Sequence, residues 1–164
     1  MKKIFPSLVS GFVASVLTTI PMLKSFSCCL IVPGAAILAL FLDRKINRNL
    51  EKITIKKALL FGFLTGLFAT FFITSFDLLI TFITKSNDLI YSLPQTEVMM
   101  RQWNLGPLFD ESLKIIKQMA TDIQTTGFSA LYTVMIFFSN FISNSIFGMI
   151  GGALGMAILN RRTD

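Results

Sequence analysis

Histidine is absent from the 164 residues, and only 15% of the chain is charged. Without histidine there is no histidine general base, no Ser-His-Asp arrangement, no HExxH motif and no Cys/His zinc spacing. The two cysteines are adjacent, at Cys28 and Cys29, so they form no disulfide framework. A vicinal pair without histidine is also a weak ligand set, and packing is the favoured role over redox chemistry or metal binding. We expect a non-enzymatic protein with no metal and no cofactor.

The shortage of charge accompanies a surplus of apolar sequence. Soluble domains carry about 25% charged residues, whereas this chain is 53% hydrophobic with a mean hydropathy of +0.69. Long apolar runs cover 4–42, 58–83 and 128–159. A water-soluble domain of this length has no core large enough to bury them. The sequence therefore predicts an all-α integral membrane protein, with residues 1–164 forming one membrane domain and the lipid bilayer as its surroundings.

The first apolar run is too long for one span. A helix over 4–42 would be about 58 Å long, compared with a hydrocarbon core of ~30 Å. A turn is marked by Pro21, Lys24, Ser25 and Ser27, which predicts short helices at about 5–20 and 28–42. The hairpin either spans the bilayer with Lys24 reaching the far interface or is partly re-entrant. Two short spans are favoured, and with helices at about 58–83 and 128–159 the bundle has four transmembrane helices.

The N-terminus has the basic-then-apolar pattern of a signal peptide, beginning with Lys2 and Lys3. No small-x-small cleavage site follows the first apolar stretch, and the sequence stays apolar as far as Leu42. We expect a retained anchor.

Basic residues mark the sides of the membrane. Residues 43–57 hold six of them against two acids, and Lys2, Lys3, Arg161 and Arg162 lie at the ends of the chain. By the positive-inside rule, both termini and the 43–57 loop are cytoplasmic in a multi-pass protein of the cell membrane. Because the basic residues flank apolar runs, the net charge of +6 does not indicate a nucleic-acid partner.

The external segment, 84–127, is the longest hydrophilic stretch. Within it an amphipathic helix is predicted at about 108–125, since apolar residues recur at steps of four and three, at Phe109, Leu113, Ile116, Ala120 and Ile123. Its apolar stripe either lies on the outer membrane surface or packs within the chain, and the second is favoured. Tyr91 and Trp103 fit interfacial anchors.

Small and polar residues share one face on each of the two long helices. On the first these are Ala58, Gly62, Gly66, Ala69, Ile73 and Asp77, and on the second Asn140, Asn144, Gly148, Gly151 and Gly155. Small residues allow helix backbones to approach closely in lipid. If Lys57 and Asn160 mark the same membrane depth, an antiparallel contact pairs Gly62 with Gly155, Gly66 with Gly151, Ala69 with Gly148 and Asp77 with Asn140.

Three polar residues are candidates for function. Asp77 is the only acid inside an apolar run, so it is either a proton or cation site or a residue at the outer interface, and the second is favoured. Asn140 and Asn144 either line a polar path or form interhelical hydrogen bonds, which is the more common role.

The stretch 148–157 near the end of the chain reads GMIGGALGMA, and the predicted hairpin at the beginning of the chain contains the Cys28-Cys29 pair. This combination resembles uncharacterised small bacterial membrane proteins with four predicted spans. The resemblance implies a bacterial inner-membrane location and no particular activity. We expect a protein that acts by association, as a homo-oligomer or as an accessory subunit of another membrane protein. The alternatives are a small oligomeric transporter or channel using Asp77, Asn140 and Asn144, and a sensor working through 84–127.

Overall fold

A computed structural model of the chain describes residues 4–47, 51–103 and 107–161, and this part of the chain is helical, without strands. The all-α prediction is therefore confirmed. In chain order the elements are α1 (Phe5–Thr18), α2 (Pro21–Lys24), the π-helix η1 (Ser27–Ile31), α3 (Val32–Asn47), α4 (Ile55–Thr84), α5 (Asp88–Trp103), α6 (Pro107–Thr126) and α7 (Ala130–Arg161).

Two of these helices, α4 and α7, are long and apolar enough to cross a membrane, in place of the four expected. α1 has 14 residues and is about 21 Å long, short of the ~30 Å hydrocarbon core. The predicted helix 28–42 begins as η1 and continues as α3, whose last turn carries Arg44 and Lys45. α1 is shorter than predicted because it ends at Thr18 and the turn begins with residues 19 and 20. α3 is less apolar than the predicted helix 28–42 because it continues into the charged residues Asp43, Arg44 and Lys45.

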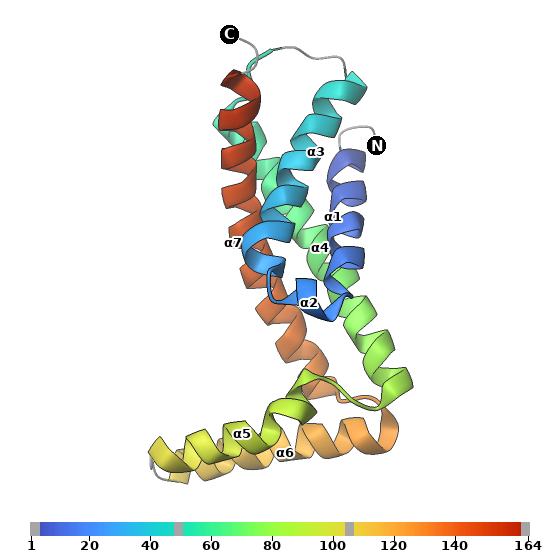
Figure 1. The fold of residues 1–164 in the computed structure, drawn as a ribbon, viewed down its shortest axis with the longest axis vertical. Helices are drawn as coiled ribbons and strands as arrows, with labels where there is room; N and C mark the ends of the chain where they lie inside the picture. The colour runs from blue at the N-terminus through green and yellow to red at the C-terminus, as the bar shows by residue number, and fades with distance from the viewer. Residues whose placement is uncertain (1–3, 48–50, 104–106, 162–164) are drawn as a thin grey trace. The chain divides into compact units, whose positions relative to one another are not determined.

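The chain divides into two compact units. Of the described residues, the first unit contains 4–47, 51–76 and 137–161, and the second contains 77–103 and 107–136. In the first unit α1, α3, the beginning of α4 and the end of α7 run side by side as a four-helix bundle (Figure 1).

The interior of the first unit consists mainly of small and hydroxyl-bearing residues. α1 buries Pro6, Ser7, Ser10, Gly11, Ala14, Ser15 and Thr18. The Ser7 hydroxyl lies 3.4 Å from the carbonyl oxygen of Phe61 on α4. One apolar cluster, Ala14, Ala35, Ala69 and Ile73, joins α1, α3 and α4. Helices with such small contact residues pack with their backbones close together.

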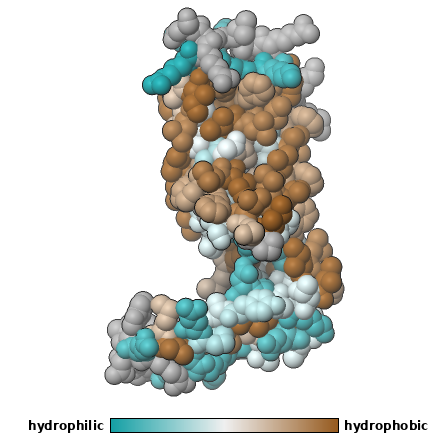
Figure 2. Space-filling model, in the orientation of Figure 1, coloured by the Kyte–Doolittle hydropathy of each residue, from teal (hydrophilic) through white to brown (hydrophobic). Residues whose placement is uncertain are grey.

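Large apolar side chains lie on the outside of the same unit. Exposed examples are Phe5, Phe12 and Val16 on α1, Leu60 and Phe71 on α4, and Phe138, Ile142, Ile146, Ile150 and Leu154 on α7. Figure 2 shows hydrophobic residues over the flank of this unit. Less than half of the most apolar stretch of α4 and of α7 is buried, 44% and 39% respectively. This distribution is the reverse of the one in a water-soluble bundle.

Local sequence explains where the helices of the second unit begin and end. The side chain of Asn87 caps α5 by accepting a hydrogen bond from the backbone N–H of Ile90 at 3.1 Å. α4 and α6 are each followed by a residue with positive φ, Lys85 at 51° and Gly127 at 79°. Their N–H groups bond back to the carbonyls of Thr81 and Ile123, which is a common way to terminate a helix.

Within the second unit α5 packs along α6 (Figure 1). The ammonium group of Lys117 on α6 lies 2.9 Å from the carboxylate of Glu97 on α5. The predicted amphipathic helix is present as α6. Of its stripe, Leu113, Ala120 and Ile123 are buried and Ile116 is half-buried, whereas the side chain of Phe109 lies outside the described residues.

The sequence analysis predicted no helix over 88–103, where the structure has α5 with Pro94 inside it. Of the two residues proposed as interfacial anchors, Tyr91 is exposed on α5, while the side chain of Trp103 is not among those described.

Candidate functional site

Glycine backbones of α4 and α7 touch in the first unit. A Cβ atom on Gly62 would overlap the carbonyl oxygen of Gly148, and one on Gly66 would overlap that of Asn144. One on Gly152 would overlap the carbonyl oxygen of Ala58. The antiparallel contact between the two long helices is therefore present, and it is made by residues four apart on each helix.

The predicted register of this contact is wrong by seven residues, or about two helical turns. Gly62 lies against Gly148 and not Gly155, and Gly66 lies against Asn144 and not Gly151. The prediction placed Lys57 and Asn160 at one depth. In the structure the side-chain amide of Asn160 accepts a hydrogen bond from the backbone N–H of Ile53 at 2.9 Å and donates one to its carbonyl oxygen at 3.0 Å. Asn160 therefore lies level with Ile53, before the start of α4, and not with Lys57.

Gly151 and Gly155 face a different helix. A Cβ on Gly151 would overlap backbone atoms of Pro33 on α3, and one on Gly155 would lie 3.2 Å from the Cα of Ile37 on the same helix. The glycine-rich end of α7 thus has two contact faces, one for α4 and one for α3. The sequence prediction assigned Gly148, Gly151 and Gly155 to a single face and did not include Gly152.

A polar seam continues the α4–α7 contact beyond the glycines. The Asn144 amide donates to the hydroxyl oxygen of Thr70 at 3.2 Å, and the Asn140 amide donates to that of Thr74 at 3.2 Å. The hydroxyl of Thr70 is within donor distance of the carbonyl oxygens of Gly66, at 2.9 Å, and Asn140, at 3.1 Å. Both asparagines therefore bond across the two helices, in the arrangement expected for interhelical hydrogen bonds. The sequence prediction missed both threonines, although they continue the four-residue spacing of Gly62 and Gly66.

The remaining members of the predicted α4 face lie elsewhere. Ala69 and Ile73 pack with Ala14 and Ala35 of the N-terminal hairpin. Asp77 is half-buried on α4 and belongs to the second unit. Asn140, the residue expected to pair with Asp77, donates its amide to Thr74.

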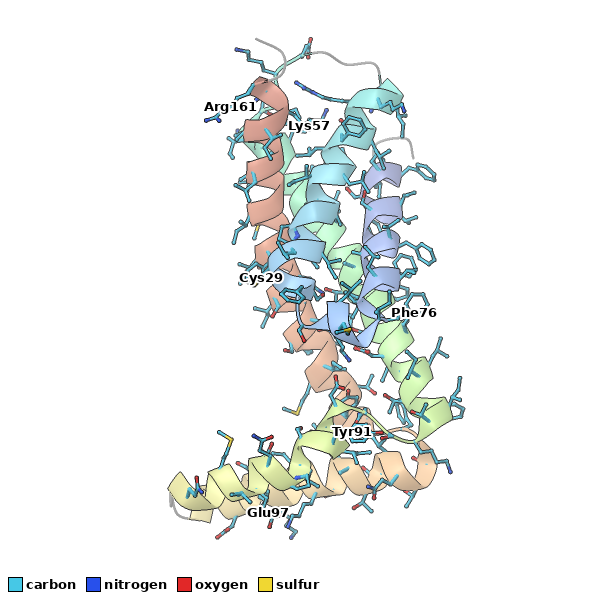
Figure 3. All side chains as sticks on the ribbon, in the orientation of Figure 1. Cys29, Lys57, Phe76, Tyr91, Glu97 and Arg161 are labelled. Carbon is cyan, nitrogen blue, oxygen red and sulfur yellow. The ribbon has the colours of Figure 1, made fainter. Side chains whose placement is uncertain are left out.

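A second polar cluster lies where α3 ends, α4 begins and α7 ends. The Asp43 carboxylate, 2% exposed, lies 2.6 Å from the ammonium of Lys57 and accepts a hydrogen bond of 2.7 Å from the Asn47 amide. Arg44 donates to the backbone carbonyl of Leu159 at 2.8 Å. These contacts join the ends of three helices, and Figure 3 shows Lys57 and Arg161 at this end of the first unit.

The potential metal ligands of the described residues do not form a cluster. Among them there is no group of three or more His, Cys, Asp and Glu side chains that could hold a metal ion. Cys29 is an exposed free thiol at η1, and the side chain of Cys28 is not described. The hydroxyls of Ser10 and Ser145 are buried without a hydrogen-bond partner among the described residues.

Two open apolar grooves mark the outside of the first unit. One, of about 460 Å³, lies between α1, α4 and α7 and is lined by Leu8, Leu67, Phe68, Phe71, Phe72, Phe137 and Phe141. The other, of about 320 Å³, is lined by Val13, Ala14, Leu17, Leu30, Ile31, Gly34, Ala35 and Leu38. A Cβ on Gly34 would meet nothing within 4 Å, so the second groove exposes helix backbone at its floor.

Comparisons of this chain with protein-family models, with curated proteins and with solved structures find no match.

Proposed function

We propose that this chain is a multi-pass integral membrane protein that acts by association, either with copies of itself or as an accessory subunit. The observation that carries the proposal is the reversed distribution of side chains in the first unit. Most of the large apolar side chains lie outside, while the inside holds mainly alanine, glycine, serine, threonine and asparagine around a small apolar cluster that includes Leu40, Phe61 and Leu159. Water would make this surface costly, since about 25 cal/mol is lost for each Å² of exposed apolar area. A bilayer removes that cost.

In this proposal α4 and α7 each cross the membrane, and the hairpin of α1 and α3 crosses as two shorter spans. Both termini and the segment between α3 and α4 lie on the cytoplasmic side, and α5 and α6 lie outside. The charge pattern supports this orientation, because Arg44, Lys45, Lys52, Lys56 and Lys57 gather at the end of α3 and the beginning of α4. Other basic residues of the topology argument, Lys2, Lys3, Arg48 and Arg162, lie outside the described residues.

Single-cysteine labelling tests the orientation. Cysteines replace Lys45, Met22 and Tyr91, one at a time, in a chain whose Cys28 and Cys29 are serine. Met22 is 83% exposed and Tyr91 is 77% exposed, so both positions are accessible to reagent. A membrane-impermeant maleimide applied to sealed inside-out vesicles is expected to label position 45 only. Labelling at position 91 would contradict the orientation, and labelling at position 22 as well as at position 45 would show that the hairpin does not cross to the outer side.

Association is supported by the groove around Gly34. Transmembrane helices meet through small residues that let their backbones approach, and Gly34 is exposed between the apolar side chains of Leu30 and Leu38. A leucine there would fill the groove without a clash inside the chain. We expect Gly34→Leu to shift the mass of the detergent-extracted complex to that of a monomer. A wild-type chain that is already a bare monomer, with no partner protein, would contradict the proposal.

A small oligomeric transporter or channel is the second candidate. The buried hydroxyls of Ser10 and Ser145 have no hydrogen-bond partner within the described part of the chain, and Ser145 adjoins Asn144, which favours a polar interior. In this case Asp77→Asn is expected to abolish ion or solute flux in liposomes while the protein stays folded. The hydrogen bonds from Asn140 and Asn144 to threonines disfavour a polar path through these residues, because both amides are already used between α4 and α7.

A further inference from the structure

One end of the first unit carries an excess of positive charge. It is formed by the end of α3, the beginning of α4 and the end of α7, which are joined by hydrogen bonds from Arg44 to Leu159 and from Asn160 to Ile53. The described residues here include six basic side chains, those of Arg44, Lys45, Lys52, Lys56, Lys57 and Arg161. They also include two acids, Asp43 and Glu51, so four positive charges remain in excess.

The more buried of the two acids already has its partners. Asp43 is 2% exposed, and its carboxylate is held by Lys57 and Asn47. It therefore neutralises one lysine and presents no negative charge to an approaching ligand. This leaves the outer positions of the cluster positively charged.

The guanidinium of Arg44 is fixed by neutral oxygens. It donates to the backbone carbonyls of Leu159, at 2.8 Å, and Glu51, at 3.0 Å, and to the amide oxygen of Asn160 at 3.3 Å. These acceptors hold its position without cancelling its charge. An arginine held in this way is a preorganised positive group, since little side-chain entropy is lost when it meets an anion.

Exposed basic and apolar residues lie next to each other around this centre. Lys45, Lys56 and Arg161 are exposed, and the neighbouring Ile46, Leu60 and Ile158 are exposed as well. Figure 2 shows the hydrophilic end of the first unit directly bordering its hydrophobic flank. A ligand that fits both must carry a negative group at the level of the lysines and hydrocarbon beside the isoleucines.

We propose that this end of the bundle binds the phosphate of anionic phospholipid headgroups. It rests on the proposed membrane location and adds a lipid class to it. Basic clusters directly beside a membrane span attract anionic lipids, and each Lys or Arg near such a surface strengthens binding by about fivefold. Arg44 supplies the fixed centre, while Lys45, Lys56 and Arg161 supply the surrounding field. The lipid acyl chains then lie along the apolar flank.

Lipid enrichment tests this inference. The protein is incorporated into nanodiscs containing equal amounts of phosphatidylglycerol and phosphatidylcholine, released gently, and analysed by native mass spectrometry for bound lipid. The wild type is expected to retain phosphatidylglycerol in at least about fivefold excess, the effect of one effective charge. The triple variant Lys45→Gln, Lys56→Gln, Arg161→Gln is expected to retain the two lipids almost equally. Added salt is expected to reduce the excess, because it screens exposed charges.

A charge-matched control separates a local site from net charge. Lys85→Gln, Lys114→Gln, Lys117→Gln removes three positive charges from the second unit and is expected to keep the enrichment. An equal loss in this control, no loss in the first variant, or no enrichment in the wild type would overturn the inference. Enrichment removed by inorganic phosphate, but not by chloride at the same ionic strength, would assign the site to a soluble anion and also overturn it. A chain that stays outside the nanodiscs would contradict the proposed function as well.

Discussion

The carbonyl oxygen of Asn144 fills the space that a Cβ atom on Gly66 would need. Gly62 and Gly148 have the same relation one turn further along, so two helices meet without side chains between them. Contacts at every fourth residue on both helices are typical of the right-handed crossing made by GxxxG motifs. Here the motif is present on α4 at 62–66 and on α7 at 148–152. The close approach brings Thr70 and Asn144 within hydrogen-bond distance.

Gly66→Leu is expected to destabilise the first unit by at least about 1–3 kcal/mol, the usual cost of overpacking a core. The four added carbons have no space beside the Asn144 backbone, so α4 and α7 must separate. Unfolding in mixed detergent micelles, followed by circular dichroism, measures the change. Ile142→Leu on α7 is the control, since Ile142 is 57% exposed and keeps its volume in this change. Equal stability of the Gly66→Leu protein and the wild type would contradict the contact.

Crosslinking distinguishes the observed register from the predicted one. The rings of Phe63 and Phe141 have centroids 6.3 Å apart, so cysteines replacing them are expected to react with a short bis-maleimide in a chain without Cys28 and Cys29. The predicted register would instead place position 63 beside Leu154. Efficient crosslinking of the 63–154 pair, with little from 63–141, would show that α4 and α7 are offset as the sequence suggested.

The sequence identified the two long helices and the fact that they pair through glycine, because both properties depend on composition and period. The predicted register is wrong because it took Lys57 and Asn160, the first polar residues at the two helix ends, as lying at the same membrane depth. Asn160 is polar but does not mark a boundary on its own. Its amide replaces the missing backbone partners of Ile53, a tertiary contact that no local pattern reveals.

The hydrophobic pattern also does not show which residues of α4 face α7 and which face the N-terminal hairpin. At 100° per residue, Ala69 and Thr70 both lie close to the face of Gly66, and the prediction included only Ala69. In the structure Thr70 faces α7, because Asn144 offers its amide there, while Ala69 faces α1 and α3. α5 could not be predicted from local preference either, because a proline inside a helix costs about 3 kcal/mol. In the structure Pro94 lies within α5, and the contact of α5 with α6 stabilises that helix.

Thr70 and Asn144 are expected to stabilise the bundle by a modest amount. Interhelical hydrogen bonds of this kind are worth about 0.6 kcal/mol on average and about 1.7 at most. A double-mutant cycle with Thr70→Val and Asn144→Ala is expected to give a coupling energy in that range, measured by detergent unfolding. Thr74→Val in place of Thr70→Val is the control, since the Asn144 amide bonds to Thr70. A Thr70–Asn144 coupling no larger than that of the control pair would show that the seam adds nothing to stability.

Asp43 and Lys57 join the end of α3 to the beginning of α4, and the pair is shielded unevenly, with the carboxylate 2% and the lysine side chain 36% exposed. Asp43→Asn is expected to cost about 1–3 kcal/mol in the free energy of unfolding, because Lys57 and Asn47 both lose a charged acceptor. Adding Lys57→Met to Asp43→Asn is expected to recover part of that loss, since an isolated charge near the bundle interior costs more than none. The exposed pair of Lys117 and Glu97 provides the contrast: Lys117→Met should change stability by less than about 1 kcal/mol. If Asp43→Asn were as mild as Lys117→Met, the three helix ends would be held by Arg44 and Asn160 alone.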